Sequence, residues 1–336
     1  MGQGMNNPVE MVEVWRGDMV ESRHRGHAVV CDARGQVVAE WGDSGTVILP
    51  RSSCKMIQAL PLVESGAARA AGLGPAQLAL ACASHQGAPV HVDLVRRWLS
   101  DIGRGENDLR CGAQPTRDKA ERTRMVQAGE APGQVHNNCS GKHTGFLTLA
   151  GHLGGGPDYV DADHPVQRAA RAAFEDVTQQ DSPLWVTDGC SAPNFATTLY
   201  GLARAMAFFA GARPDTGDAR GRAAGDLVAA MLAHPMLVAG EGRACTALMQ
   251  AMEGKVAAKT GAEGVFTAIL PERGLGVALK IEDGATRAAE TAITGILAHL
   301  GVLNRDHPTA ATYLDAPVVN WRGIRTGRIR LAEGFA

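Results

Sequence analysis

The sequence predicts an α+β fold, with β-strands at both ends of the chain and helices in the middle. Short β-rich segments precede residue 50, helical apolar spacing dominates residues 52–253, and strand patterns return in residues 254–336. Sheet and helices are therefore segregated along the chain, whereas a doubly wound fold alternates them. Each terminal group of strands is too small to be stable alone. We expect one antiparallel sheet built from both chain ends, with the central helical region packed on it.

The N-terminal part of the sheet is predicted from three short segments. Residues 1–10 are polar and rich in Gly and Asn, and we expect them to be frayed. β-rich segments follow at residues 11–15, 27–32 and 36–41. Between the last two, Ala33-Arg34-Gly35 is typical of a hairpin turn, so these two strands are expected to pair.

The central segment is predicted to be mainly helical. Apolar residues recur there at the three- and four-residue spacing of an amphipathic helix. One short strand is predicted among the helices, at Trp185-Val186-Thr187. The predicted helices cover residues 52–66, 75–83, 88–102, 142–152, 164–178, 194–212, 219–233 and 243–253.

Strand patterns return near the C-terminus, at residues 255–259, 264–270 and 274–281. A helix is predicted at residues 286–300. The remaining tail is rich in Pro and Arg, and we predict no regular element in it.

We expect a single catalytic unit that spans residues 11–336. Its sheet region comprises residues 11–51 and 254–336, and residues 52–253 form the mainly helical region. No Gly-x-Gly-x-x-Gly follows a strand, and the sequence has no Walker A motif and no internal repeat. The sequence therefore argues against a dinucleotide-binding fold, a P-loop nucleotidase and a solenoid.

Composition excludes further classes of function. The net charge is −2 and there is no basic block, so neither nucleic acid nor an anionic membrane surface is an expected partner. The sequence has no apolar stretch long enough to span a bilayer and no signal-peptide pattern. The seven cysteines are odd in number and scattered, which is typical of thiols or metal ligands. We therefore expect a cytoplasmic protein.

The most informative segment is Arg51-Ser52-Ser53-Cys54-Lys55, which follows an apolar run and precedes a predicted helix. Residues three apart share a helix face, so Lys55 reaches the hydroxyl of Ser52 more easily than that of Ser53. A neutral amine there can take the proton of the serine and make it a nucleophile. Penicillin-recognising enzymes combine the same Ser-x-x-Lys with a Lys-Thr-Gly, which here is Lys259-Thr260-Gly261. The alternative is a serine at a helix N-terminus beside a solvated lysine.

Two further segments concentrate ionisable side chains. His136 through His143 open a predicted helix, whose N-terminus suits an anion or an oxyanion. Asp188-Gly189-Cys190 follows the short predicted strand. Candidate zinc ligands are Cys139 and Cys190, together with His136, His143 or Asp188. In the alternative interpretation, both thiols are small apolar residues of the core.

Ser84 and His85 lie in a loop between two predicted helices. A serine beside a histidine is compatible with a catalytic pair, although neighbours in sequence rarely face each other. The alternative is that the Ser84 hydroxyl caps a helix or binds substrate.

Together these segments resemble the asparaginase II family, the L-asparaginases of the Rhizobium etli type. They occur in the order of the family across nearly the whole chain. The run His-Asn-Asn-Cys-Ser-Gly-Lys-His followed by Asp-Gly-Cys is far more specific than Ser-x-x-Lys. The matching segments are residues 14–17, 50–55, 84–85, 136–143, 188–190 and 259–264.

The resemblance implies a fold similar to those of serine β-lactamases and serine-dependent glutaminases, assembly as a homodimer, and hydrolysis of L-asparagine to L-aspartate and ammonia. It implies that Ser52 is the nucleophile and Lys55 its base. It also implies that Ser84 and Lys259 form a second Ser–Lys pair at the same site.

The resemblance further implies a zinc ion held by Cys139, Lys142 and Cys190. A lysine ligand is unusual because the amine must lose its proton before it binds. His143 and Asp188 match polar residues that orient the substrate or a metal-bound water. For the α-carboxylate of the substrate, our candidate partner is Arg51.

The sequence departs from the family pattern at Met56, where members often have Pro. The Ser-Asp-Asn motif of penicillin-recognising enzymes is absent, which argues against β-lactamase activity. The alternative functions are a serine-dependent glutaminase, a β-lactamase-like hydrolase and, from another class, a non-enzymatic zinc-binding module.

Overall fold

The computed structural model describes residues 7–336, and the chain divides into two compact units. The first, called here the sheet unit, comprises Met1–Ser53, Thr198–Gly211 and Ala247–Ala336. The second, called the helical unit, comprises Cys54–Thr197 and Ala212–Thr246. The division differs from the expected sheet region (11–51 and 254–336) and helical region (52–253) in three places: residues 52–53, 198–211 and 247–253 belong with the sheet unit.

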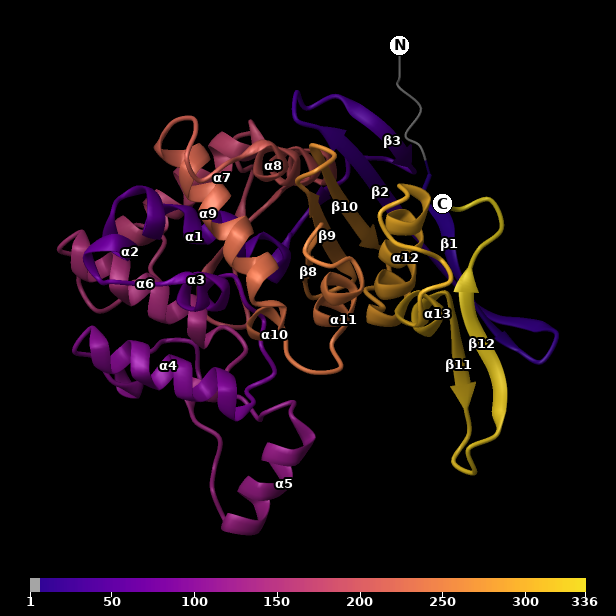
Figure 1. Cartoon of the computed structure of the whole chain (residues 1–336), viewed down its shortest axis with the longest axis horizontal. Coiled ribbons are helices and arrows are strands. Elements are labelled where there is room, and N and C mark those ends of the chain that lie inside the picture. Colours follow the sequence, from indigo (N-terminus) through magenta and orange to yellow (C-terminus); the bar gives the residue numbers. More distant parts are fainter. Residues whose placement is uncertain (1–6) are drawn as a thin grey trace. The chain divides into compact units, whose positions relative to one another are not determined.

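The sheet unit contains an eight-stranded sheet in the order β11-β12-β1-β2-β10-β9-β8, with β3 paired to β2. Strands from the two chain ends are adjacent, because β1 pairs with β12 and β2 pairs with β10, both antiparallel (Figure 1). This confirms the predicted α+β class and the predicted sheet from both ends. The bounds are β1 (Val9–Arg16), β2 (Met19–Asp32), β3 (Val37–Trp41), β8 (Ala257–Thr260), β9 (Val265–Leu270), β10 (Leu275–Ile281), β11 (Asp315–Val319) and β12 (Arg325–Leu331).

Helices α8 (Leu199–Gly211) and α12 (Thr286–His299) both pack on the central strands β9 and β10. All residues of β9 are buried, which requires cover on both faces of the sheet. Gly276 on β10 allows the closest approach, since a Cβ there would lie 2.0 Å from the backbone nitrogen of Ala207 on α8. A third helix of this unit is α13 (Pro308–Leu314).

Two expectations about the chain ends need correction. The frayed segment was expected to reach residue 10, but β1 begins at Val9; residues 1–6 lie outside the described part. The Pro/Arg-rich tail, for which no element was predicted, contains α13 and the hairpin β11–β12. β12 lies beside β1 and has no buried residue, so its pattern lacks the apolar alternation that marks a half-buried strand.

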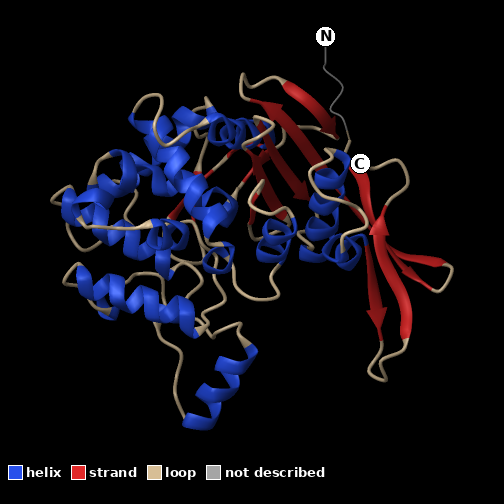
Figure 2. Cartoon of the chain, in the orientation of Figure 1, coloured by secondary structure: helices blue, strands red, loops and turns tan. Residues whose placement is uncertain are grey.

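The helical unit is built around α1, whose residues Lys55–Leu62 are all buried. Within this unit α1 packs against α3, α6, α7 and α9. Figure 2 shows helices in blue and strands in red. Two predictions are wrong here: α5 was not expected, and residues 193–195 form strand β6 instead of starting a helix. The bounds are α1 (Lys55–Glu64), α2 (Ala67–Ala70), α3 (Pro75–Ala81), α4 (Pro89–Asp101), α5 (Lys119–Ala128), α6 (Ser140–His152), α7 (Pro165–Thr178), β5 (Trp185–Thr187), β6 (Pro193–Phe195), α9 (Ala219–Ala233) and α10 (Pro235–Val238).

Short elements complete the chain: the 3₁₀ turns η1 (Arg51–Cys54), η2 (Glu106–Asp108) and η3 (Gln134–His136), the strands β4 (Val47–Ile48) and β7 (Thr197–Thr198), and the helix α11 (Ala244–Ala251). Within residues 7–336, the structure has no helix of the length and apolar character needed to cross a membrane.

Candidate active site

The turn that carries Ser52 is held by its neighbours in the sheet unit. Both the backbone nitrogen and the hydroxyl of Ser53 donate to the carbonyl of Pro50, at 3.2 Å and 2.7 Å. Ser53 is fully buried, whereas Ser52 is half-buried. The preceding residue, Arg51, has a positive φ of 54°, which a residue with a side chain rarely adopts. The Ser53 hydroxyl is committed to the turn, so of the two serines Ser52 is the better candidate nucleophile.

The segment that carries Lys259 packs against this turn within the sheet unit. A Cβ on Gly261 would lie 2.7 Å from the Pro50 carbonyl oxygen, so only glycine allows the approach. The hydroxyl of Thr267 lies 3.1 Å from the carbonyl oxygen of Ser53 and 3.2 Å from that of Lys259. The Lys259 side chain is 1% exposed, and its Nζ donates to the Thr260 carbonyl at 2.8 Å. The predicted Lys-Thr-Gly segment thus lies beside the Ser52 turn.

In the helical unit, Lys55 lies at the start of α1 and is 1% exposed. Its Nζ donates to the carbonyls of Ala83 at 2.6 Å and Asn138 at 3.4 Å, and it contacts the Ser84 hydroxyl at 3.1 Å. The structure therefore brings together two candidate catalytic residues, Lys55 and Ser84, that the resemblance assigned to different pairs. Neither carbonyl partner, Ala83 or Asn138, was singled out from the sequence.

His85 joins the Ser84 loop to the start of α6. Its Nδ1 accepts a hydrogen bond from Gly87 at 3.1 Å, so the ring proton is on Nε2, which donates to the Ser140 hydroxyl at 2.9 Å. Ser140 in turn donates to the Val135 carbonyl. Burial lowers the pKa of His85 well below its usual value, and the ring stays neutral. His85 therefore holds the loop that carries Ser84 against the start of α6.

Three candidate metal ligands converge at the start of α6. The Nζ of Lys142 lies 3.2 Å from the sulfur of Cys190, and all three side chains are buried. The hydrogen bond between the two thiols raises the pKa of Cys139 to about 12 and lowers that of Cys190 well below its usual value. Burial lowers the pKa of Lys142, but the charges of Cys190, Cys139 and Asp188 outweigh it and raise the pKa. The directions of these pKa shifts favour the charged forms of Cys190 and Lys142.

These donors fit a zinc ion under one condition. Within residues 7–336, the structure has no group of three or more His, Cys, Asp or Glu side chains placed to hold a metal ion. A zinc held here would therefore need the amine of Lys142 in addition to the sulfurs of Cys139 and Cys190. Zinc favours thiolate ligands and displaces protons from its ligands on binding. The donor set is thus compatible with zinc once Lys142 is deprotonated.

Gly141 allows the start of α6, which carries Cys139 and Lys142, to pack closely on α3. A Cβ at this position would lie 2.4 Å from the carbonyl oxygen of Leu80 on α3. Glycine therefore lets the first turn of α6, with Cys139 before it and Lys142 within it, pack directly on α3.

His143 is fully buried on α6. The hydroxyl of Tyr159 accepts a hydrogen bond from the backbone of Arg110 and forms a second hydrogen bond with His143 Nδ1 at 2.9 Å. The Nε2 atom of His143 is buried and has no hydrogen-bond partner among the described residues. An unpaired buried polar atom is costly, so this atom is available for a ligand or a water. Tyr159 gave no signal in the sequence, because it lies in a loop without a motif.

Asp188 is half-buried in the turn after β5. Its Oδ1 accepts from the backbone of Gly189 at 2.8 Å, and its Oδ2 lies 3.9 Å from the sulfur of Cys190. Ser191 closes the turn with a positive φ of 70°. The structure therefore brings Asp188 next to the candidate metal ligands, as an outer partner of Cys190.

Arg51 lies in the sheet unit and lines a cavity of about 410 Å³ there. Four further ionisable side chains line the same cavity, namely His27, Glu263, Lys280 and Glu282. Glu263, like Arg51, has a positive φ, of 57°. A cavity with both cations and carboxylates is suited to a zwitterion, which is compatible with the predicted role of Arg51.

Comparison with solved structures finds weak likenesses to proteins of two kinds. The protein Mglu in its Tris and glutamate form is 13% identical with a TM-score of 0.48, and the match covers 90% of this chain and 64% of that chain. Native Mglu is 14% identical with a TM-score of 0.47, covering 84% and 66%. This chain spans a little under two thirds of these Mglu chains. A β-lactamase from Mycobacterium bovis is 15% identical with a TM-score of 0.36, covering 83% and 95%.

No curated protein sequence matches the chain. The sequence model of a protein family, L-asparaginase II, matches residues 12–331. This range contains every candidate site residue described above, from Arg51 to Lys259, and both units contribute to it. The family supports an amidohydrolase activity. From this match over nearly its whole length, the chain belongs to the L-asparaginase II family.

Proposed function

We propose that the protein is an L-asparagine amidohydrolase, which releases ammonia from the side-chain amide and leaves L-aspartate. Membership of the L-asparaginase II family supports the reaction class. The observation that carries the proposal is the buried contact of 3.1 Å between the amine of Lys55 and the hydroxyl of Ser84. A buried lysine amine beside a serine hydroxyl is one arrangement that supports acid–base and nucleophilic catalysis of amide cleavage.

In the proposed reaction, Ser52 attacks the amide carbon of the substrate and Lys55 takes its proton. Backbone N–H groups near Ser52 stabilise the tetrahedral oxyanion. Ser84 and Lys259 pass a proton to the leaving nitrogen, and ammonia departs. Water then hydrolyses the ester between Ser52 and the aspartyl group, which regenerates the enzyme.

Substrate binding is proposed for three residues. Arg51 holds the α-carboxylate by a charge-assisted hydrogen bond, and Asp188 pairs with the α-ammonium group. The unpaired Nε2 atom of His143 forms a hydrogen bond with the substrate or with an ordered water. A zinc ion held by Cys139, Lys142 and Cys190 would supply a positive charge close to this group.

Measurement of ammonia release from L-asparagine tests the proposal. Wild-type protein should be active, and Ser52→Ala should lose nearly all activity while it remains folded. If Ser52→Ala retains activity and Ser84→Ala loses it, Ser84 is the nucleophile. Unchanged activity in both variants would contradict the Ser–Lys mechanism and favour a non-enzymatic zinc-binding module.

The choice of substrate is tested separately. Turnover of L-asparagine should exceed that of L-glutamine, because the family to which the chain belongs is the L-asparaginase II family. A higher rate with L-glutamine would make the protein a serine-dependent glutaminase, and nitrocefin cleavage would indicate a β-lactamase-like hydrolase. We also propose that the protein is a cytoplasmic homodimer. Light scattering after size-exclusion chromatography tests the dimer, and cell fractionation tests the location.

A further inference from the structure

A second cavity, separate from the candidate active site, lies between α4, α5 and the loop that leads to η3. Its volume is about 400 Å³, and all of its lining residues belong to the helical unit. Part of the wall is apolar and is formed by Pro89, Val92 and Met125. The rest carries ionisable side chains, whose bonding decides what the cavity can hold.

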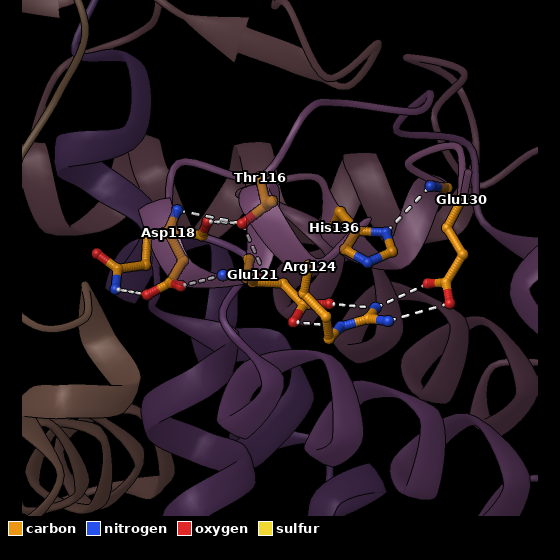
Figure 3. Close-up of polar contacts among 9 residues, drawn as sticks. Thr116, Asp118, Glu121, Arg124, Glu130 and His136 are labelled. Carbon is orange, nitrogen blue, oxygen red and sulfur yellow. Dashed lines mark hydrogen bonds and ion pairs between the residues drawn. The ribbon is translucent and has the colours of Figure 1, made fainter. Parts of the chain in front are cut away.

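Three of these side chains satisfy one another. Arg124 donates to both carboxylate oxygens of Glu121, at 2.7 and 2.9 Å, and to both of Glu130, at 3.0 and 2.7 Å. Figure 3 shows the guanidinium between the two carboxylates and next to the ring of His136. These hydrogen bonds lower the pKa values of Glu121 and Glu130, so both remain charged. Two carboxylates and one guanidinium leave a net charge of −1 on this wall.

Three other polar groups of the cavity are open to a ligand: the side chains of Asp93 and Arg96, and the Nε2 atom of His136. Asp93 and Arg96 are exposed and lie three residues apart on α4, and neither side chain forms a hydrogen bond or an ion pair within residues 7–336. His136 Nδ1 accepts from the backbone of Gly133 at 3.0 Å, which places the ring proton on Nε2. That Nε2–H has no partner in the described part of the chain. The cavity thus offers one carboxylate, one guanidinium and one imidazole N–H donor.

We propose that this cavity binds a zwitterionic α-amino acid with an apolar side chain. Its ammonium group pairs with Asp93, its carboxylate pairs with Arg96 and accepts from His136 Nε2–H, and its side chain packs on the apolar wall. Asp93 and Arg96 cancel each other in charge, and the remaining −1 disfavours a ligand with net negative charge. A zwitterion therefore fits the cavity better than a dicarboxylate.

The position of the cavity connects it to the candidate active site within the same unit. On one side, the α5 cap Asp118 accepts from the side chain of Gln86 at 3.0 Å, and Gln86 lies two residues after Ser84. On the other side, His136 lies two residues before Asn138, whose carbonyl accepts from Lys55. A ligand that orders both walls of the cavity would also affect the Ser84 loop and the segment that contains Asn138. By thermodynamic linkage, a ligand in the candidate active site would affect binding in the cavity to the same extent.

Isothermal titration of the full chain with L-leucine tests the binding site. L-leucine has no side-chain amide, so the result does not depend on the proposed reaction at Ser52. We expect saturable binding, weakened about tenfold in Asp93→Ala and in Arg96→Ala, since each loses one hydrogen-bonded charge pair. The matched controls Arg97→Ala and Asp101→Asn change exposed residues of α4 outside the cavity, and their affinity should stay within about twofold of wild type.

Two ligand analogues and one mapping experiment complete the test. 4-Methylpentanoate lacks the ammonium group and isoamylamine lacks the carboxylate, so both should bind at least tenfold more weakly than L-leucine. Hydrogen exchange should show protection by L-leucine in residues 116–138, and less protection in Arg96→Ala at the same subsaturating concentration of L-leucine. Absence of binding, equal binding of the analogues, or protection confined to other segments would overturn the proposal.

Discussion

The Nζ atom of Lys55 lies 3.1 Å from the Oγ atom of Ser84, although the two residues are 29 positions apart in the sequence. Two backbone carbonyls, of Ala83 and Asn138, hold the same amine. Because the contact is buried, the position of the amine is set by the protein and not by solvent. This contact connects α1 to the Ser84 loop, and in the proposed reaction the amine takes part in a proton transfer.

Replacement of Lys55 by Met should reduce kcat for ammonia release by a factor of about 10² to 10⁴, the usual effect of losing a positioned acid–base group. Lys255→Met is the matched control, because that lysine is exposed and precedes β8. Activity is measured with L-asparagine, and circular dichroism confirms that the variants are folded. Activity of Lys55→Met near the wild-type value would show that Lys55 has no part in the chemistry.

The candidate metal site gives a second prediction. Wild-type protein that is purified from zinc-supplemented cultures should retain bound zinc. The Cys190→Ser variant should retain much less, because a serine hydroxyl is a poor replacement for a thiolate ligand. Cys111→Ser is the matched control. The Cys111 thiol donates a hydrogen bond to the Gln134 carbonyl, and a serine hydroxyl can make the same bond. Metal content is measured by mass spectrometry of the purified variants. Equal zinc in all three proteins would exclude Cys190 as a ligand.

Close packing in the sheet unit gives a third prediction. Gly276→Ala should lower the free energy of unfolding by about 3 kcal/mol or more, because its Cβ would lie 2.0 Å from the Ala207 nitrogen and 2.4 Å from the Ala203 oxygen. Gly105→Ala is the control, since a Cβ there meets nothing within 4 Å. Urea denaturation of both variants measures the difference. A similar small effect for both would mean that α8 can move away from β10 at low cost.

Much of the fold could be predicted because its patterns are local. The strands at 264–270 and 274–281 and most helices follow from apolar spacing within a few residues. The hairpin β11–β12 could not be predicted, because the arginines at positions 325, 328 and 330 interrupt the alternation of apolar and polar residues that marks a strand. Helix α5 was missed for a similar reason: only Glu121 and Met125 of its residues are buried.

The sequence predicted which residues form the candidate site, but it did not predict which of them contact one another. Motifs and the family resemblance named Lys55 and Ser84, yet a contact across 29 positions depends on how α1 and the following loop pack. Tyr159 holds the candidate residue His143 through one hydrogen bond, and nothing in its sequence surroundings indicates that contact. Long-range contacts of this kind are a property of the packed chain and leave no periodic pattern in a single sequence.

The last prediction concerns the dependence of protein stability on pH, and it rests on two stacked histidines, His85 and His91. Their ring centroids are 4.9 Å apart with an interplanar angle of 9°, and both side chains are buried. Burial lowers the pKa of His91, and the backbone carbonyls of Met236 and Ala88 and the charge of Asp118 only partly oppose this effect. His91 Nε2 donates to the Met236 carbonyl, while its Nδ1 is buried without a hydrogen-bond partner among residues 7–336.

Because the pKa of His91 is lower in the folded state than in the unfolded chain, the unfolded state binds more protons below pH ~6.5. The free energy of unfolding should therefore fall as the pH is lowered from 7 to 5, by up to about 1.4 kcal/mol per pH unit for each such histidine. His91→Leu should reduce this slope, while the exposed His152→Gln should leave it unchanged. Urea titrations at several pH values measure the slope. If His91→Leu and wild type lose stability equally on acidification, His91 is not one of the groups that become protonated on unfolding, and other buried groups cause the loss.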